Sequence, residues 1–409
     1  MGQVLINALA STAGGGVTYL RNVLPRLGRI DPARPYLVLV PPGQLAACRG
    51  LAGGRVRVET ARVRGGALGR FAWEQAWLRP RLRRRAVDVL VSLGNFALLA
   101  APVPQILFNR NDLYFSPDFA RDLRARGRYG ALVAHAAKSW LARLSARTAA
   151  VNVAPTAAFA ERVCARAGGA RPFVVLPFGF DPAVFAADAE PPDEALLGKL
   201  APNRRRLLYV SHYNYFRNFE TLLRALPRLR ELTGGGVQLV LTTDLRRGAV
   251  YGGYDATAAA ELIDRLGVRD EIAMLGPVPY GKLHHLYACC DVFVCPSYSE
   301  SFGHPLVEAM ASGLPVVAAD LPVHREVCGE AARYFPVFDG GALAEECAGV
   351  LADDGLRAGM AARGLARAQE FSWDEHVRGL VAVIDDCLAR GGRGETRAAR
   401  AGVRAEVKS

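Results

Sequence analysis

The sequence predicts an α/β protein with two Rossmann-like domains, and two observations carry this prediction. Short apolar strands alternate with amphipathic helical segments, a pattern typical of parallel sheets covered by helices on both faces. The pattern stops in a polar, proline-containing stretch, residues 189–203, and then starts again. The 409 residues are enough for two such domains. Because ligands of these folds lie beyond the carboxyl ends of the strands, we expect the two domains to face a central cleft that holds the site.

The elements of each half follow the same order of strand, polar turn and helix. Residues 4–9 form an apolar run, the glycine-rich turn 11–16 follows, and residues 17–27 have helical spacing. Polar or glycine-containing segments separate the later runs, as expected for loops between buried strands. Further strands are predicted over residues 36–40, 55–59, 105–108, 206–210, 237–242, 272–275, 292–295 and 316–319.

Composition shifts set the predicted boundaries. We predict a first domain over residues 1–188, a second that starts at residue 204, and a basic tail over 391–409. The tail mixes arginine with glycine and alanine and offers little apolar surface to bury, so we predict that it is disordered. Hydrophobic residues make up 51% of the chain and charged residues 22%, which excludes a mainly disordered protein.

The ends and the cysteines favour a cytoplasmic protein. The first residues lack a basic leader and a long apolar run, so we expect no secretory signal. Residues 89–108 are apolar, but Pro102 and Pro104 interrupt them, which favours two buried strands over a membrane span. No C-x-x-C pair occurs among the eight cysteines, and the histidines lack metal-ligand spacing. We therefore interpret the cysteines as reduced, buried side chains and expect no metal site.

The segment 296–317 carries the strongest chemical signal. It follows the buried strand that ends at Cys295, and Pro305 suits the first turn of a helix, where a missing N–H costs nothing. Backbone N–H groups at such a helix start bind phosphates or sugar hydroxyls. One turn into this helix, the Glu308 carboxylate can accept both hydroxyls of a ribose. Glu300 precedes the helix and can accept hydroxyls of a bound hexose.

Glu300 and Glu308, with seven residues between them, resemble the E-x7-E motif of retaining glycosyltransferases of family 4, within the glycosyl transferases group 1. The resemblance implies the GT-B fold, with a second domain over residues 204–370 and a C-terminal helix over residues 371–390 that crosses back to the first domain. It also implies that Glu300 contacts the donor sugar and Glu308 the nucleotide ribose. Further contacts with the sugar and diphosphate fall to Ser301, Phe302, Gly303 and His304.

A second part of the resemblance lies in residues 208–223. Arg217-Asn218 stands where the family has Lys-Asn, and His212 stands where it has an arginine. The resemblance assigns both basic positions to the donor diphosphate. The planar guanidinium of an arginine can donate two hydrogen bonds side by side to phosphate oxygens. The histidine is a departure from the family, because its ring is only partly protonated near neutral pH.

The resemblance places two further groups of residues in the site. Gly15 and Gly16 end a glycine-rich loop that the family uses at the donor phosphate. This loop lacks the G-x-G-x-x-G spacing and the P-loop lysine, so we reject a dehydrogenase or NTPase. Arg110 and Asn111 stand where the family often has a histidine beside the reacting centre, so we assign them to the acceptor side.

The activity implied is transfer of a hexose-type sugar from a UDP- or GDP-sugar to an acceptor hydroxyl with retention, in polysaccharide or glycolipid synthesis. Neither a metal nor a cofactor is expected. Two alternatives stay open: a GT-B nucleotide-sugar-binding protein without transferase activity, and a nucleotide-sugar epimerase. A phosphorylase of this architecture would need a pyridoxal-phosphate lysine, and the second half is poor in lysine.

The basic excess adds a prediction about partners. The chain has 51 Lys and Arg against 39 Asp and Glu, a net charge of +12, which favours anionic partners. Arginines gather over residues 62–85 and 121–147 of the predicted acceptor-binding half. A glycan or lipid-linked acceptor at the inner face of an anionic membrane fits them, and ordinary solvated helix faces remain the alternative. No nucleic-acid-binding module is recognisable.

Overall fold

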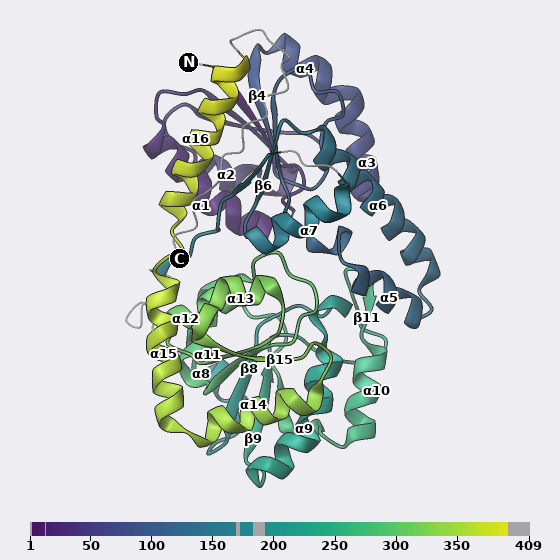
Figure 1. The fold of residues 1–409 in the computed structure, drawn as a ribbon, viewed down its shortest axis with the longest axis vertical. Helices are drawn as coiled ribbons and strands as arrows, with labels where there is room; N and C mark the ends of the chain where they lie inside the picture. Colours follow the sequence, from purple (N-terminus) through teal and green to yellow (C-terminus); the bar gives the residue numbers. More distant parts are fainter. Residues whose placement is uncertain (1, 13, 169–171, 183–192, 392–409) are drawn as a thin grey trace. The chain divides into compact units, whose positions relative to one another are not determined.

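Two parallel sheets organise the part of the chain that the computed structural model describes, residues 2–12, 14–168, 172–182 and 193–391. Each sheet lies in its own compact unit (Figure 1). Unit 1 comprises Met1–Phe115, Val133–Pro177 and Trp373–Ser409, and unit 2 comprises Ser116–Leu132 and Phe178–Ser372. The chain therefore passes between the units four times. The predicted tail, apart from Gly391, lies outside the described residues.

The sheet of unit 1 has seven parallel strands in the order β3-β2-β1-β4-β5-β6-β7. Its central strands β1 and β4 have buried apolar residues at their middle positions, as expected where helices cover both faces. The strand order reverses between β1 and β4, so the crevice of this unit lies at their carboxyl ends. The strands are β1 (Gln3–Asn7), β2 (Tyr36–Val40), β3 (Val56–Thr60), β4 (Val87–Ser92), β5 (Gln105–Phe108), β6 (Val151–Ala154) and β7 (Phe173–Val175).

Helices connect these strands, and α3 continues through a π-helical turn, Glu74–Leu78, into α4. The predicted apolar stretch 89–108 forms the end of β4, an irregular loop and β5, which confirms two buried strands there. Among the described helices, none has the length and apolar character needed to cross a membrane. The helices are α1 (Gly15–Ile30), α2 (Leu45–Leu51), α3 (Gly66–Trp73), α4 (Arg79–Arg84), α6 (Tyr129–Thr148) and α7 (Ala157–Ala167).

The sheet of unit 2 has six parallel strands in the order β12-β9-β8-β13-β14-β15. The order reverses between β8 and β13, which places the crevice of this unit at their carboxyl ends. The strands are β8 (Arg205–Tyr209), β9 (Val237–Leu241), β12 (Ile272–Met274), β13 (Val292–Cys295), β14 (Val316–Ala319) and β15 (Ala332–Phe335). The helices are α9 (Phe219–Thr233), α10 (Thr257–Leu266), α11 (Leu283–Cys289), α12 (His304–Ala311), α13 (Pro322–Cys328), α14 (Gly340–Ala352) and α15 (Asp354–Ala368).

The last described helix, α16 (Trp373–Gly391), belongs to unit 1 (Figure 1). It packs against α1 and β4. The guanidinium of Arg34, which precedes β2, donates to Asp385 of α16 at 2.5 Å, and Arg26 of α1 donates to Asp374 at 2.9 Å. The predicted return of the final helix to the first domain is therefore confirmed.

The two units do not meet at residue 188, where the sequence predicts the end of the first domain. Residues 116–132, which include α5 (Pro117–Ala125), are part of unit 2, as is the chain over Phe178–Ser372. Phe119 of α5 packs edge-on against Phe216 with ring centroids 6.2 Å apart, and Arg126 pairs with Glu220 at 3.0 Å. Within the polar stretch 189–203 between the two predicted domains, residues 194–197 form the short helix α8, whose first turn is capped by Asp193.

Candidate functional site

The motif segment begins at the carboxyl end of β13, in the crevice of unit 2. The chain leaves β13 at Cys295 and enters α12 at His304, with Pro305 in the first turn as predicted. Gly303 caps the helix with φ +88°, and a Cβ there would lie 2.8 Å from Leu306 Cδ1. This position therefore requires glycine. The result is a sharp turn that presents the backbone at the start of α12.

Arg217 and Glu300 meet at this edge. Arg217 ends the 3₁₀ turn Tyr215–Arg217 after β8, and its Nη1 donates to Glu300 Oε2 and, at 3.4 Å, to Ser297 Oγ. Burial alone would lower the pKa of Arg217, but the charge of Glu300 raises it above its usual value. The Asn218 amide donates to Pro296 O at 3.0 Å, so it fixes one segment on the other. The crevice thus holds a half-buried cation paired with a carboxylate.

Glu308 lies one turn inside α12 and is 5% exposed. Its Oε2 accepts a hydrogen bond from Tyr287 Oη at 2.8 Å. Burial raises the pKa of Glu308 to about 7. The group can therefore change its charge near neutral pH, and its carboxylate form accepts hydroxyl donors.

The remaining predicted residues of unit 2 lie around the same turn. His212 follows β8 with an exposed imidazole, and its carbonyl oxygen accepts from Ser211 Oγ at 3.0 Å. Ser301 is buried. The Phe302 ring is also buried and packs against Phe178, with centroids 5.3 Å apart. The His304 ring stacks on Phe178 at 5.2 Å. Phe302 therefore contributes its backbone to the crevice, while its side chain belongs to the core.

The predicted residues of unit 1 also come together, around the start of α1. The Arg110 Nη2 donates to Gly15 O at 2.7 Å, and its guanidinium lies 4.6 Å from the centre of the Tyr19 ring. A Cβ on Gly16 would lie 2.9 Å from Ser11 Cα, so the close turn requires glycine. Asn111 Oδ1 accepts from Leu113 N at 3.1 Å and caps a 3₁₀ turn. Arg110 therefore holds the glycine loop in place.

Sequence reasoning missed the tyrosine that donates to Glu308. Tyr287 lies in α11, 21 residues before Glu308. Nothing in the sequence around this tyrosine says which carboxylate it meets.

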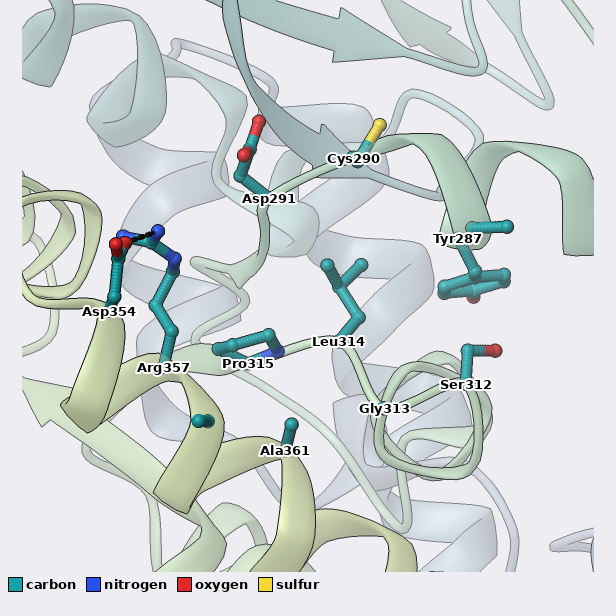
Figure 2. A pocket seen from close by; sticks show the side chains of 12 residues that line it. Tyr287, Cys290, Asp291, Ser312, Gly313, Leu314, Pro315, Asp354, Arg357 and Ala361 are labelled. Atoms are coloured by element: carbon teal, nitrogen blue, oxygen red, sulfur yellow. Dashed lines mark hydrogen bonds and ion pairs between the residues drawn. The ribbon is translucent and has the colours of Figure 1, made fainter.

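A cavity of about 380 Å³ lies at the opposite, amino-terminal edge of the sheet in unit 2. Asp291 and Pro315, which directly precede β13 and β14, line it together with Arg357 of α15 (Figure 2). Tyr287 also lines this cavity, although its hydroxyl bonds to Glu308. The residues that line the cavity include none of Arg217, Glu300 and Glu308, so it is separate from the crevice that holds Arg217. Within the described residues, no three His, Cys, Asp or Glu side chains are grouped so that they could hold a metal ion.

Comparisons with known proteins show which proteins this chain resembles. Residues 198–367 match the family model of glycosyl transferases group 1, and they contain Arg217, Glu300 and Glu308. Two curated relatives are the O-antigen chain mannosyltransferase B of Escherichia coli and the phosphatidyl-myo-inositol mannosyltransferase of Mycolicibacterium smegmatis. The first is 35% identical over 168 residues, 41% of this chain and 42% of the relative. The second is 33% identical over 204 residues, 49% and 48% respectively. The chain thus spans less than half the length of these relatives.

Solved structures match over nearly the whole chain. The Anabaena protein HepE, crystallised in complex with UDP and glucose, has a TM-score of 0.70 and 20% identity over 94% of this chain and 100% of its own. Sucrose-phosphate synthase from Thermosynechococcus elongatus has a TM-score of 0.74 and 16% identity over 95% and 100%. The fold of this chain is therefore GT-B, as predicted.

Proposed function

We propose that this chain, whose residues 198–367 match the glycosyl transferases group 1, is a retaining glycosyltransferase. It moves a hexose-type sugar from a UDP- or GDP-sugar to an acceptor hydroxyl in glycoconjugate synthesis. The observation that carries the proposal is the pairing of Arg217 with Glu300 beside the start of α12, one turn from Glu308. This edge offers a cation for a diphosphate and carboxylates for sugar and ribose hydroxyls.

The geometry suggests how the leaving diphosphate is stabilised. When the bond from sugar to phosphate breaks, negative charge develops on the diphosphate. The N–H groups at the start of α12, which the helix holds in place, and Arg217, once it turns from Glu300 to the phosphate, can stabilise that charge, which is the main way such sites lower a barrier. Glu300, once Arg217 turns to the phosphate, can accept hydroxyls of the sugar. We propose that the reaction uses neither a metal nor a cofactor, with these groups in their place.

A screen of donors tests the proposal. Purified protein is incubated with UDP- and GDP-sugars, and release of UDP or GDP is followed with and without candidate glycan and lipid-linked acceptors. Arg217→Ala and Glu308→Ala should both weaken binding of the selected donor, whereas Arg333→Ala, an exposed arginine of β15, should not. Binding that stays intact in both site variants would contradict the site. If the protein binds a nucleotide sugar but releases no UDP or GDP with any acceptor, it would be better described as a nucleotide-sugar-binding protein. If the sugar of the donor is changed while still attached to the nucleotide, the protein would be an epimerase.

We further propose that unit 1 contacts an anionic membrane at the cytoplasmic face, where a lipid-linked acceptor would lie. Leu68 of α3 is 42% exposed, Trp77 of the π turn 58% and Trp140 of α6 63%. The helix α6 contains no acidic residue. Exposed tryptophan together with arginine is typical of surfaces that rest at the head-group level of a bilayer. Exposed arginines beside Leu68 and Trp77 are Arg62, Arg64, Arg79, Arg81, Arg83 and Arg84.

Vesicle sedimentation tests the membrane contact. The protein should bind vesicles that contain phosphatidylglycerol at low salt, and binding should fall with salt and on Trp77→Ser or Trp140→Ser. Leu365→Ser, which changes an exposed apolar residue of unit 2, should leave binding unchanged. Equal binding to neutral phosphatidylcholine vesicles, or none to anionic ones, would contradict the contact.

A further inference from the structure

One helix of unit 2, α5, holds both segments that meet at the pair of Arg217 and Glu300. It lies within residues 116–132, and the chain on either side of this segment belongs to unit 1. Asp122 Oδ2 of α5 accepts a hydrogen bond from the Tyr298 hydroxyl at 2.7 Å. Tyr298 is 2% exposed and lies two residues before Glu300. The helix therefore fixes the segment that carries this carboxylate.

Arg126, the residue that follows α5, fixes the other segment. Its Cζ lies 4.2 Å from the centre of the Tyr215 ring, at the start of the 3₁₀ turn that ends in Arg217. Its Nη1 donates to Glu220 Oε1 at 3.0 Å, and Glu220 lies in the first turn of α9, three residues after Arg217. Arg126 thus contacts the chain on both sides of Arg217.

The two anchors are joined to each other. Arg126 Nε donates to Asp122 Oδ1 at 2.7 Å, and the side chains of this pair are 21% and 18% exposed. The backbone N–H of Tyr298 donates to Phe216 O at 3.0 Å, and the Phe216 ring packs against Phe119 of α5. A connected polar network that lies mostly out of water is rigid, so the groups attached to it keep one geometry.

We propose that Arg126 and Asp122 are positioning residues of the donor site: they hold the turn that carries Arg217, so that its side chain reaches a bound diphosphate. The inference rests on the proposed function, which assigns Arg217 to the diphosphate. The charged groups of Arg126 and Asp122 are engaged with each other, with Glu220 and with Tyr298, so they act through Arg217 and not on the nucleotide itself. A shift of about 1 Å in such a group is costly for binding and catalysis.

A double-mutant cycle tests this role. Arg126→Lys keeps the charge, so it leaves long-range attraction of the diphosphate in place, but it loses the planar group that bonds to two carboxylates. The cycle comprises Arg126→Lys, Arg217→Ala and the variant with both changes. Arg357→Lys of α15 is the matched control, because the Arg357 side chain is 15% exposed and bonds to Asp354 and, at 3.1 Å, to Val350 O.

The probes are UDP, GDP and ADP, and the nucleotide that the unaltered protein binds is carried forward. The shift of the melting temperature with nucleotide concentration reports the stability of each variant and its affinity, weak affinity included. Circular dichroism checks that each variant is folded. If Arg126→Lys does not fold, Tyr298→Phe takes its place in the cycle, because it removes a single oxygen from the same network.

We expect Arg126→Lys to weaken nucleotide binding about 3- to 30-fold, the range for residues that act on a site through their neighbours. With Arg217→Ala already present it should have no further effect, because the group that it positions is gone. Arg357→Lys should leave the affinity unchanged, whatever it does to the melting temperature. If the Arg217→Ala protein no longer responds to the nucleotide, the comparison of Arg126→Lys with Arg357→Lys decides alone.

Three results overturn the positioning role: unchanged nucleotide binding in Arg126→Lys, an equal loss with and without Arg217, or an equal loss in Arg357→Lys. A different result marks a failure of the proposed function. If Arg217→Ala leaves nucleotide binding intact, or if the unaltered protein binds none of the three nucleotides, the proposed function fails first and the positioning role fails with it.

Discussion

Arg217 and Glu300 form an ion pair at the carboxyl edge of the sheet in unit 2, with side chains 23% and 11% exposed. The cation assigned to the diphosphate is thus the partner of the carboxylate assigned to the sugar. Each charge is stabilised by the other in a partly buried place, where an unpaired charge would be costly. A diphosphate that approaches this edge competes with Glu300 for Arg217.

Arg217→Ala should lower the rate of sugar transfer by about 100- to 1,000-fold, the usual effect of removing a group that stabilises developing charge. It should also lower the melting temperature, because Glu300 is left without its partner. Adding Glu300→Gln should recover much of the melting temperature but none of the rate. This contrast, measured by calorimetry and initial rates, separates the structural from the catalytic contribution. Recovery of the rate in the double variant would contradict the assigned role of Arg217.

Nucleotide binding should tighten as the pH rises through 7. Burial raises the pKa of Glu308 to about 7, and the protonated carboxyl group has lost one of its two acceptor oxygens. Calorimetry between pH 5.5 and 8.5 measures the effect. Glu308→Gln is the control: it should bind more weakly, and its pH dependence should reflect the nucleotide phosphates and the other groups alone. Identical pH profiles for the variant and the unaltered protein would refute the prediction.

The same shift predicts the sign of a stability change. A carboxyl group with a raised pKa in the folded state favours folding below its unfolded value of 4.5, and this contribution is lost as the pH rises toward 7. Glu308→Gln should therefore gain stability relative to the unaltered protein between pH 5 and 8. A shift of this size corresponds to about 3 kcal/mol. Denaturant melts of both proteins at pH 5 and pH 8 measure the difference.

His376 should act in the opposite direction in unit 1. Burial lowers its pKa to about 4, and its ring bonds to Pro177 O at 2.9 Å and Tyr19 Oη at 3.0 Å. As the pH falls from 6.5 toward 4, the unfolded chain takes up a proton that the folded protein resists, so stability falls. His376→Gln should melt at a temperature that depends less on pH in this window. A melting curve that responds to acid as before would show that other groups dominate.

Gly303→Ala should destabilise unit 2 by about 1–3 kcal/mol, because φ is +88° and the new Cβ would clash with Leu306. The start of α12 would shift, so KM for the donor should rise. Gly281→Ala is a matched control in the same unit, since a Cβ there meets no atom within 4 Å and its φ is not in the left-handed region. Equal melting temperatures for both variants would contradict the requirement for glycine at 303.

Much of the fold could be predicted from the sequence because the central strands are continuous apolar runs. The strands over 292–295 and 316–319 have the predicted bounds. By contrast, β15 carries Arg333 and Tyr334 and lies at the edge of the sheet, where one side faces solvent, so it gave no apolar run. The helix start at His304 followed from glycine and proline chemistry. Local patterns of this kind are visible in a sequence.

Contacts between distant residues were not predictable in the same way. Glu308 of α12 accepts a hydrogen bond from Tyr287 of α11, which lies 21 residues earlier, and no local pattern records that contact. The segment 116–132 is polar, and its membership of unit 2 depends on pairs such as Arg126 with Glu220. Residues that form hydrogen bonds and ion pairs across the fold are not regularly spaced in the sequence. Their partners can therefore be identified only in the three-dimensional structure.

The place of α16 has a consequence for synthesis on the ribosome. All segments of unit 2 have been translated by Ser372, but unit 1 still lacks the helix that packs on α1 and β4. The unit that begins first is therefore the one completed last. Until Trp373–Gly391 has left the exit tunnel, the side of α1 that α16 covers stays exposed to other chains. This face of α1 is therefore the part of the nascent protein that needs protection for longest.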